Sequence, residues 1–189
     1  TSDGGYILAG NSESFGFDAW LVKTNSTGSM EWNKTFGGTA GADYSFSVQQ
    51  TSDSGYILGG HYTVNTTNTD AWLIKTNSTG GMQWNKTFGG TRVDQAKSVQ
   101  QTSDGGYIFG GNYGVTPTNQ DVYLVKTNST GGMQWSKTYG GTAEDYANSV
   151  QQTSDGGYIL AAWTNSFGAG NYDFWLVKTD SSGNMQWNK

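Results

Sequence analysis

Aspartates that recur at fixed spacing are the first candidates for chemistry in this sequence. One set precedes Gly or Ser in a short turn, a second precedes an apolar run, and a third lies between repeats. The sets are Asp3, Asp53, Asp104 and Asp155; Asp18, Asp70, Asp121 and Asp173; and Asp43, Asp94 and Asp145. Calcium takes six to eight oxygen ligands, and no D-x-D-x-D-G loop supplies them. We expect structural carboxylates that accept turn N–H groups, with no metal and no cofactor.

Residues for catalysis are few. His61 is the only histidine, it has no counterpart in the other repeats, and the chain has no cysteine. A general base or a metal ligand needs oriented partners, so we expect a solvent-facing loop histidine. The sequence also contains no H-E-x-x-H, G-x-S-x-G or G-x-x-x-x-G-K-[ST] motif. We predict no catalytic residue and no enzymatic activity.

Asparagines in N-x-S/T sequons are candidate glycosylation sites. They are Asn25, Asn33, Asn65, Asn77, Asn85 and Asn128. Three of them recur at one turn and two at one strand position, where Asp180 and Ser136 replace Asn in single copies. The alternative is an Asn turn that tolerates left-handed backbone. Both interpretations stay open.

Aromatic side chains offer the stacking surfaces that sugar rings require. Eight of them recur at two fixed positions, as packing between repeats demands, and we expect these in the core. They are Trp32, Trp84, Trp135 and Trp187, and Trp20, Trp72, Tyr123 and Trp175. Other aromatic residues occur where the repeats differ. From these we select as ligand-binding candidates Tyr62, Tyr113, Trp163, Phe167 and Tyr172. The same variable loops also contain Phe15, Phe17 and His61. Drift of unconstrained loops explains the same variation.

Composition narrows the class of protein. The 189 residues carry a formal charge of −5, only 13% are charged and 14% are aromatic. Such a chain has ample apolar area for a core, whereas a nucleic-acid partner would favour a basic surface. No apolar run approaches the roughly 20 residues of a membrane span, so we expect no membrane insertion. Disulfides and thiolate metal sites are excluded because there is no cysteine.

Internal repeats determine the expected fold. The segment that begins Thr1-Ser-Asp-Gly-Gly-Tyr returns at Thr51, Thr102 and Thr153, and Met30-x-Trp32 also returns three times. Both landmarks give a period of about 51 residues, which is typical of the blades of a propeller. In the last repeat four strand-like runs, a to d, are separated by turn signals. They are Ala147–Thr153, Tyr158–Ala162, Phe174–Lys178 and Met185–Lys189.

The faces of these strands indicate stacked sheets. In strand c of the first repeat Ala19 and Leu21 point to one side, and Trp20 and Val22 to the other. A strand that is apolar on both faces belongs to a sheet between two neighbours. In strand d we expect Met30, Trp32 and Phe36 to share one face. On such a blade the b–c and d–a loops emerge at the same end.

We therefore predict an all-β fold, a single repeat domain over 1–189 built as a β-propeller of four-stranded antiparallel blades. About four blades are expected, at 1–44, 45–95, 96–146 and 147–189. The first contains strands b, c and d only, so one inner strand is missing. A longer array, a strand from a neighbouring chain, or a ring that tolerates the gap would each account for it, and we favour the first slightly.

The strings S-V-Q-Q-T-S-D-G-G-Y-I-L-A, D-A-W-L-V-K-T-N-S-T-G and M-Q-W-N-K-T-F-G-G-T carry a resemblance. The blade plan resembles that of WD-type propellers, without their Trp-Asp dipeptide, and the fuller strings are similar to repeats of secreted and cell-surface propeller-like proteins of archaea and bacteria. The resemblance implies an extracellular or cell-surface location and a role in adhesion, structure or assembly, with other copies or other surface proteins as partners. The alternative is a lectin-like propeller that binds glycans through its b–c and d–a loops.

Overall fold

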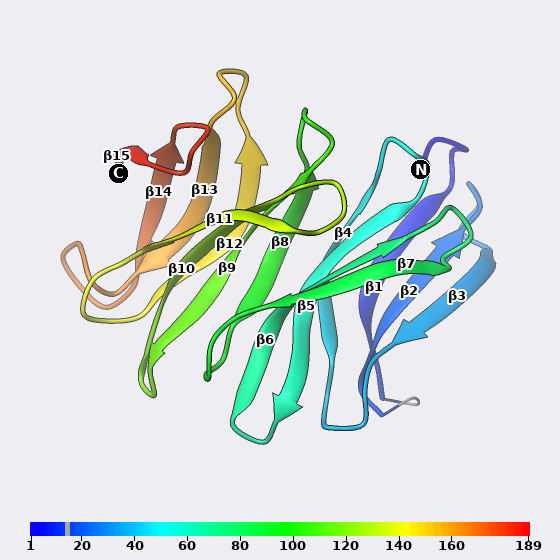
Figure 1. Ribbon diagram of the computed structural model, residues 1–189, viewed down its shortest axis with the longest axis horizontal. Coiled ribbons are helices and arrows are strands. Elements are labelled where there is room, and N and C mark those ends of the chain that lie inside the picture. Colours follow the sequence, from blue (N-terminus) through cyan, green and yellow to red (C-terminus); the bar gives the residue numbers. More distant parts are fainter. Residues whose placement is uncertain (14–15) are drawn as a thin grey trace.

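The structure, a computed structural model, describes residues 1–13 and 16–189 and consists of fifteen β-strands. They form four separate antiparallel sheets whose strands follow chain order (Figure 1). Within the described residues no helix is long and apolar enough to cross a membrane. The predicted all-β fold is confirmed.

The strands repeat with nearly constant spacing. The first sheet holds β1 (Tyr6–Ser12), β2 (Asp18–Thr24) and β3 (Met30–Phe36). The second holds β4 (Tyr44–Gln50), β5 (Tyr56–Asn65), β6 (Asn68–Thr76) and β7 (Met82–Phe88). The third holds β8 (Gln95–Gln101), β9 (Tyr107–Thr116), β10 (Asn119–Thr127) and β11 (Met133–Tyr139). The fourth holds β12 (Asp145–Gln152), β13 (Tyr158–Thr164), β14 (Asp173–Thr179) and β15 (Met185–Asn188).

The first sheet has three strands and each of the others has four, so the sheet order matches the predicted blades with one inner strand missing. The inner strands β4, β8 and β12 each begin one or two residues before the expected start of the blade. They do so because their pairing with strand b continues to these residues. The outermost pairs are Tyr44 with His61, Gln95 with Asn112 and Asp145 with Thr164.

Successive sheets pack face to face through a repeated aromatic contact. The strand-d tryptophan of one sheet meets the first tyrosine of strand b in the next. The ring centroids of Trp32 and Tyr56 lie 5.8 Å apart, those of Trp84 and Tyr107 5.6 Å, and those of Trp135 and Tyr158 5.7 Å. We call the tryptophan side of a sheet its trailing face and the tyrosine side its leading face.

A glycine completes each of these contacts. Gly80, Gly131 and Gly183, in the c–d turns, have φ of 76–78° and lie under the tryptophan of the preceding sheet. A Cβ on Gly80 would stand 2.7 Å from the Trp32 ring. Both the left-handed backbone and the close approach therefore require glycine.

Strand c is buried on both sides in the second and third sheets, as predicted, whereas in the first and fourth sheets only the side that faces the neighbouring sheet is buried. Ala19 and Leu21 belong to the core between the first two sheets, where they meet Trp72 and Ile74 of the second sheet. The strand-d expectation was wrong for Met30. A register shift after Lys23 turns Met30 away from Trp32. Its sulfur lies 3.5 Å from the Asn33 amide nitrogen, on the leading face.

The a–b turns confirm the structural role of the first aspartate set. In each turn the carboxylate accepts the N–H of the second residue after it, as Asp53 does from Gly55 at 3.0 Å. Each carboxylate also pairs at 2.8 Å with a lysine of strand c whose side chain is almost fully buried. The pairs are Asp3–Lys23, Asp53–Lys75, Asp104–Lys126 and Asp155–Lys178.

The inter-sheet tryptophans should dominate stability. We expect Trp84→Ala to lower the free energy of unfolding by about 2–4 kcal/mol, since it removes the contact with Tyr107 and leaves a cavity. Met82→Ala, at an exposed position of the same strand, is the control and should change it by less than about 0.5 kcal/mol. Urea denaturation measures both, and equal effects would contradict the role given to Trp84.

The aspartate–lysine pairs predict acid sensitivity. Burial has the largest single effect and would raise the pKa of Asp53 and Asp104. Hydrogen bonds from the paired lysine, from a threonine hydroxyl and from a glycine N–H together outweigh it and lower the pKa to about 2. A carboxyl with a lowered pKa stabilises the fold above its unfolded pKa of 3.8, and this contribution is lost as pH falls toward 2. Thermal melts from pH 6 to pH 2 should therefore show a steep decline, shallower in Asp53→Asn. An unchanged slope in that variant would contradict the assignment.

Candidate functional site at the loop end of the blades

The b–c and d–a loops meet at one end of the sheets, as expected from the blade plan. The N–H of Asp43 donates to the Phe17 carbonyl at 2.8 Å, and that of Asp94 donates to Thr69 at 2.7 Å. Phe15 lies outside the described residues. This end is where the four repeats differ in sequence.

Buried aspartates of the d–a loops hold this end together. Asp43 accepts the N–H of Gly38 and that of Thr63, each at 2.7 Å. Asp94 does the same for Gly90 at 2.7 Å and Gly114 at 2.8 Å. One carboxylate thus ties the d–a loop to strand b of the sheet that follows the loop. The structural role expected for this aspartate set is confirmed, since each carboxylate accepts backbone N–H groups.

The aspartates at the start of strand c lie beside them. Gly89 separates the carboxylates of Asp70 and Asp94, and Gly140 separates those of Asp121 and Asp145. Burial raises the pKa of Asp70, Asp94 and Asp121, with a further contribution from the neighbouring carboxylate in the last two. Across residues 1–13 and 16–189 no group of three or more His, Cys, Asp or Glu side chains could hold a metal ion.

The inner strands carry a second set of variable residues. β4, β8 and β12 each contain a register shift at one position, where the residue is left out of the ladder. That position holds Phe46, Lys97 and Asn148, three unrelated side chains in an otherwise repeated strand. A bulge residue is free of the pairing pattern, so it tolerates substitution more easily than its neighbours.

His61 lies among these residues, and the expectation of a solvent-facing loop histidine was wrong. It belongs to β5, is buried, and its ring lies 5.0 Å from that of Tyr44 and 5.5 Å from that of Phe46. Its Nδ1 lies 3.1 Å from the Gln95 side-chain nitrogen. Burial, and then the nearby Lys97 charge, lower the pKa of His61 to about 4. The ring is therefore neutral at pH 7.

A cavity of about 280 Å³ lies between the third and fourth sheets beside this group. Its lining includes Gln95, Lys97, Asn112, Tyr146, Asn148 and Trp163. Lys97 is half-buried, its ammonium stands 3.8 Å from the Phe46 ring centroid, and burial lowers its pKa. Asn112 is 4% exposed, and its Oδ1 has no hydrogen-bond partner. The cavity thus combines a cation, amides and two aromatic rings.

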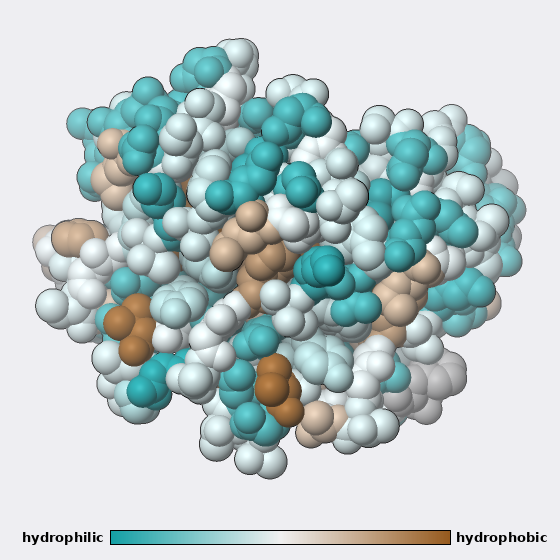
Figure 2. Space-filling model, in the orientation of Figure 1, coloured by the Kyte–Doolittle hydropathy of each residue, from teal (hydrophilic) through white to brown (hydrophobic). Residues whose placement is uncertain are grey.

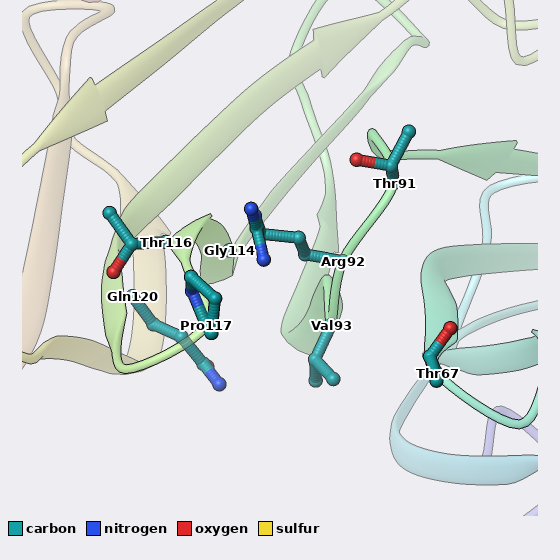
Figure 3. A pocket seen from close by; sticks show the side chains of 8 residues that line it. All are labelled: Thr67, Thr91, Arg92, Val93, Gly114, Thr116, Pro117 and Gln120. Atoms are coloured by element: carbon teal, nitrogen blue, oxygen red, sulfur yellow. The ribbon is translucent and has the colours of Figure 1, made fainter.

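A second cavity of about 290 Å³ adjoins it and shares Val93 and Gln120 (Figure 3). It lies between the hairpin of β9 and β10 and the d–a loop, and Arg92 extends toward Pro117. Figure 2 shows a surface that is largely hydrophilic or neutral, with apolar residues in small separate patches.

The five aromatic candidates fall into two groups. Tyr62 and Tyr113 lie in strands β5 and β9, because these hairpins extend further than expected, and they are not in loops. Their rings pack 5.4 Å from Trp72 and 5.1 Å from Tyr123, so they support the core.

The other three lie in β13 of the fourth sheet or in the loop between β13 and β14, and they are exposed. Trp163, in β13 and also not in a loop, lies 5.3 Å from the Tyr172 ring and 5.8 Å from that of Tyr146. Phe167 packs 5.5 Å from Trp175. Trp163 is the candidate that lines the cavity beside Lys97.

The sequon asparagines all use their side chains in local structure. In the c–d turns Asn25, Asn77 and Asn128 accept N–H groups of their own turn through Oδ1. The left-handed residue of each turn is the glycine three positions on, which corrects the Asn-turn alternative. Asn33 and Asn85 accept the indole N–H of Trp20 and Trp72, and Asn65 caps the exposed tip of its hairpin.

No protein-family model matches the sequence, and no curated protein matches it. Among solved structures, the chain is similar to BamB from Moraxella catarrhalis, a β-propeller, with a TM-score of 0.54 and 14% identity over 100% of this chain and 46% of that one. It also matches the tail fibre of Staphylococcus aureus phage P68 with a TM-score of 0.33 and 9% identity over 93% and 47%. The chain spans about half the length of these proteins, and its fold is that of about four propeller blades.

Proposed function

We propose that this chain is a non-catalytic module of the extracellular surface that acts in adhesion or assembly. The observation that carries the proposal is the open array. The first and last sheets lie at opposite ends of the longest axis, and each keeps one face that no sheet of the described chain covers (Figure 1). Open faces built like the internal ones provide contact surfaces for further blades or other surface proteins.

The charged groups support binding rather than catalysis. The aspartate–lysine pairs stabilise the a–b turns, and the buried aspartates of the d–a loops hold the backbone at the loop end. The surface location rests on the resemblance of the repeats. Glycosylation of the sequons fits that location and forms part of the same proposal.

An assembly module should associate at micromolar concentration. For the 189-residue chain of 20.3 kDa, light scattering should show a mass in solution that exceeds the covalent mass of the same sample by intact-mass spectrometry. A mass in solution that equals the covalent mass over the whole concentration range would contradict the assembly role.

A lectin-like function is the second candidate, and the cavity beside Lys97 favours it. Trp163 and Tyr146 supply ring faces, while Gln95, Asn112 and Asn148 supply amides. None of the ion pairs in the described part of the chain includes Lys97. Because the cation is half-buried without a carboxylate, an acidic sugar suits the cavity better than a neutral one.

Glycan arrays that include carboxylated and neutral sugars test this candidate. We expect binding to carboxylated sugars, weakened at least about 10-fold in Lys97→Gln and in Trp163→Ala. Lys34→Gln changes an exposed lysine of β3 and serves as the matched control. An array without signal, or equal binding by all variants, would remove the lectin from consideration.

A further inference from the structure

The leading face of the first sheet exposes residues that are buried in every other sheet. Tyr6 is 58% exposed, whereas its counterparts Tyr56, Tyr107 and Tyr158 are each 2% exposed. Leu8 is 52% exposed, whereas the equivalent residues of the other sheets are fully buried. The first sheet thus presents half of the contact that the internal sheets make with one another.

The trailing face of the fourth sheet presents the other half. Trp187 occupies the position of Trp32, Trp84 and Trp135 and is 44% exposed, because no tyrosine stands against it. Phe174 is 70% exposed, whereas its counterparts Ala19, Ala71 and Val122 are fully buried. Two apolar half-contacts therefore lie at the two ends of one chain.

The first sheet also has the turn glycine on which a tryptophan packs at the internal contacts, and none of the described residues lies against it. At the internal contacts a Cβ on Gly80, Gly131 or Gly183 would meet the preceding tryptophan within 2.8 Å. Gly28 has the same left-handed backbone, with φ of 83°, and nothing lies within 4 Å of its Cβ position. It lines a cavity of about 400 Å³ together with Leu8, Trp20 and Met30. Trp187 is the same residue type that packs on the equivalent glycine at the three internal contacts.

Phe174 of the fourth sheet has a size that suits the space left by the missing inner strand of the first sheet. In the internal contacts Ala71 shares its core with Ala96 and Val99, which come from the inner strand of the next sheet. The first sheet has no inner strand, so that space is open. A phenylalanine in place of alanine supplies volume where the partner lacks it.

We propose that the occupant of each face is a second copy of this chain, joined head to tail, and that two copies close into one ring. This rests on the assembly role proposed above and names its partner. The continuity of the contact with three internal ones supports the pairing. Two copies are expected to close a ring because the four sheets follow the curvature of a β-propeller and correspond to 46% of that chain. Two copies, related by a two-fold axis, then make both joints identical.

Charged substitutions at the two faces test the pairing. We expect the unaltered 189-residue chain to have about twice the mass of 20.3 kDa by analytical ultracentrifugation. Leu8→Lys and Trp187→Glu should each raise the dissociation constant by about 100-fold or more, because each buries an unpaired charge in a joint. Met133→Lys, at an exposed position of β11 away from both faces, should leave it unchanged. Far-UV circular dichroism confirms that all variants fold.

Mixing distinguishes head-to-tail pairing from other modes. A mixture of the Leu8→Lys and Trp187→Glu proteins forms a pair with one unaltered joint and one Lys–Glu joint, so it should regain two-copy mass. Dissociation by only one of the two variants would indicate pairing of like faces and overturn the proposal. Longer polymers would overturn the closed ring. Two-copy mass in both variants would overturn the end-face pairing but leave the assembly role standing, whereas a wild-type protein of single-copy mass would overturn both.

Discussion

The stacking of a strand-d tryptophan on the tyrosine and glycine of the next sheet is the contact on which the rest of the structure depends. A single four-stranded sheet that is apolar on both faces cannot bury them alone, and this contact covers one face of each neighbour. It also explains the composition. The tryptophan supplies apolar area, the tyrosine packs against its ring, and the glycine leaves room for the indole, so all three recur in each repeat while the loops change.

Charge is arranged around that contact in two ways. At the a–b turn end a buried lysine pairs with the turn aspartate in every sheet, so this end differs little between the repeats. At the other end buried aspartates fix the backbone of loops whose side chains differ. A rigid backbone under variable side chains is how repeat scaffolds present binding surfaces. The bulge positions Phe46, Lys97 and Asn148 extend this variation onto the inner strands.

The repeat period, the strand order and the two-sided burial of strand c could be predicted from the sequence, since each depends on spacing within one repeat. Met30 and His61 could not. Met30 is turned by a register shift that leaves no mark in the apolar pattern. His61 becomes buried because hairpin β5–β6 extends further than the turn signals suggest and brings it against Tyr44 and Phe46. The cavity beside Lys97 could not be predicted either, because its walls come from two adjacent sheets. How two sheets pack does not follow from the spacing of residues within one repeat.

A stacked array whose sheets are covered only by their neighbours is left with two uncovered faces, whatever its length. Tyr6, Leu8, Phe174 and Trp187 are exposed on the two outer faces of the four described sheets. Closure removes both faces at once, and a chain whose own sheets follow about half of a propeller reaches closure only with more blades. The same tryptophan contact that holds neighbouring sheets together therefore also determines what the ends of the array can bind.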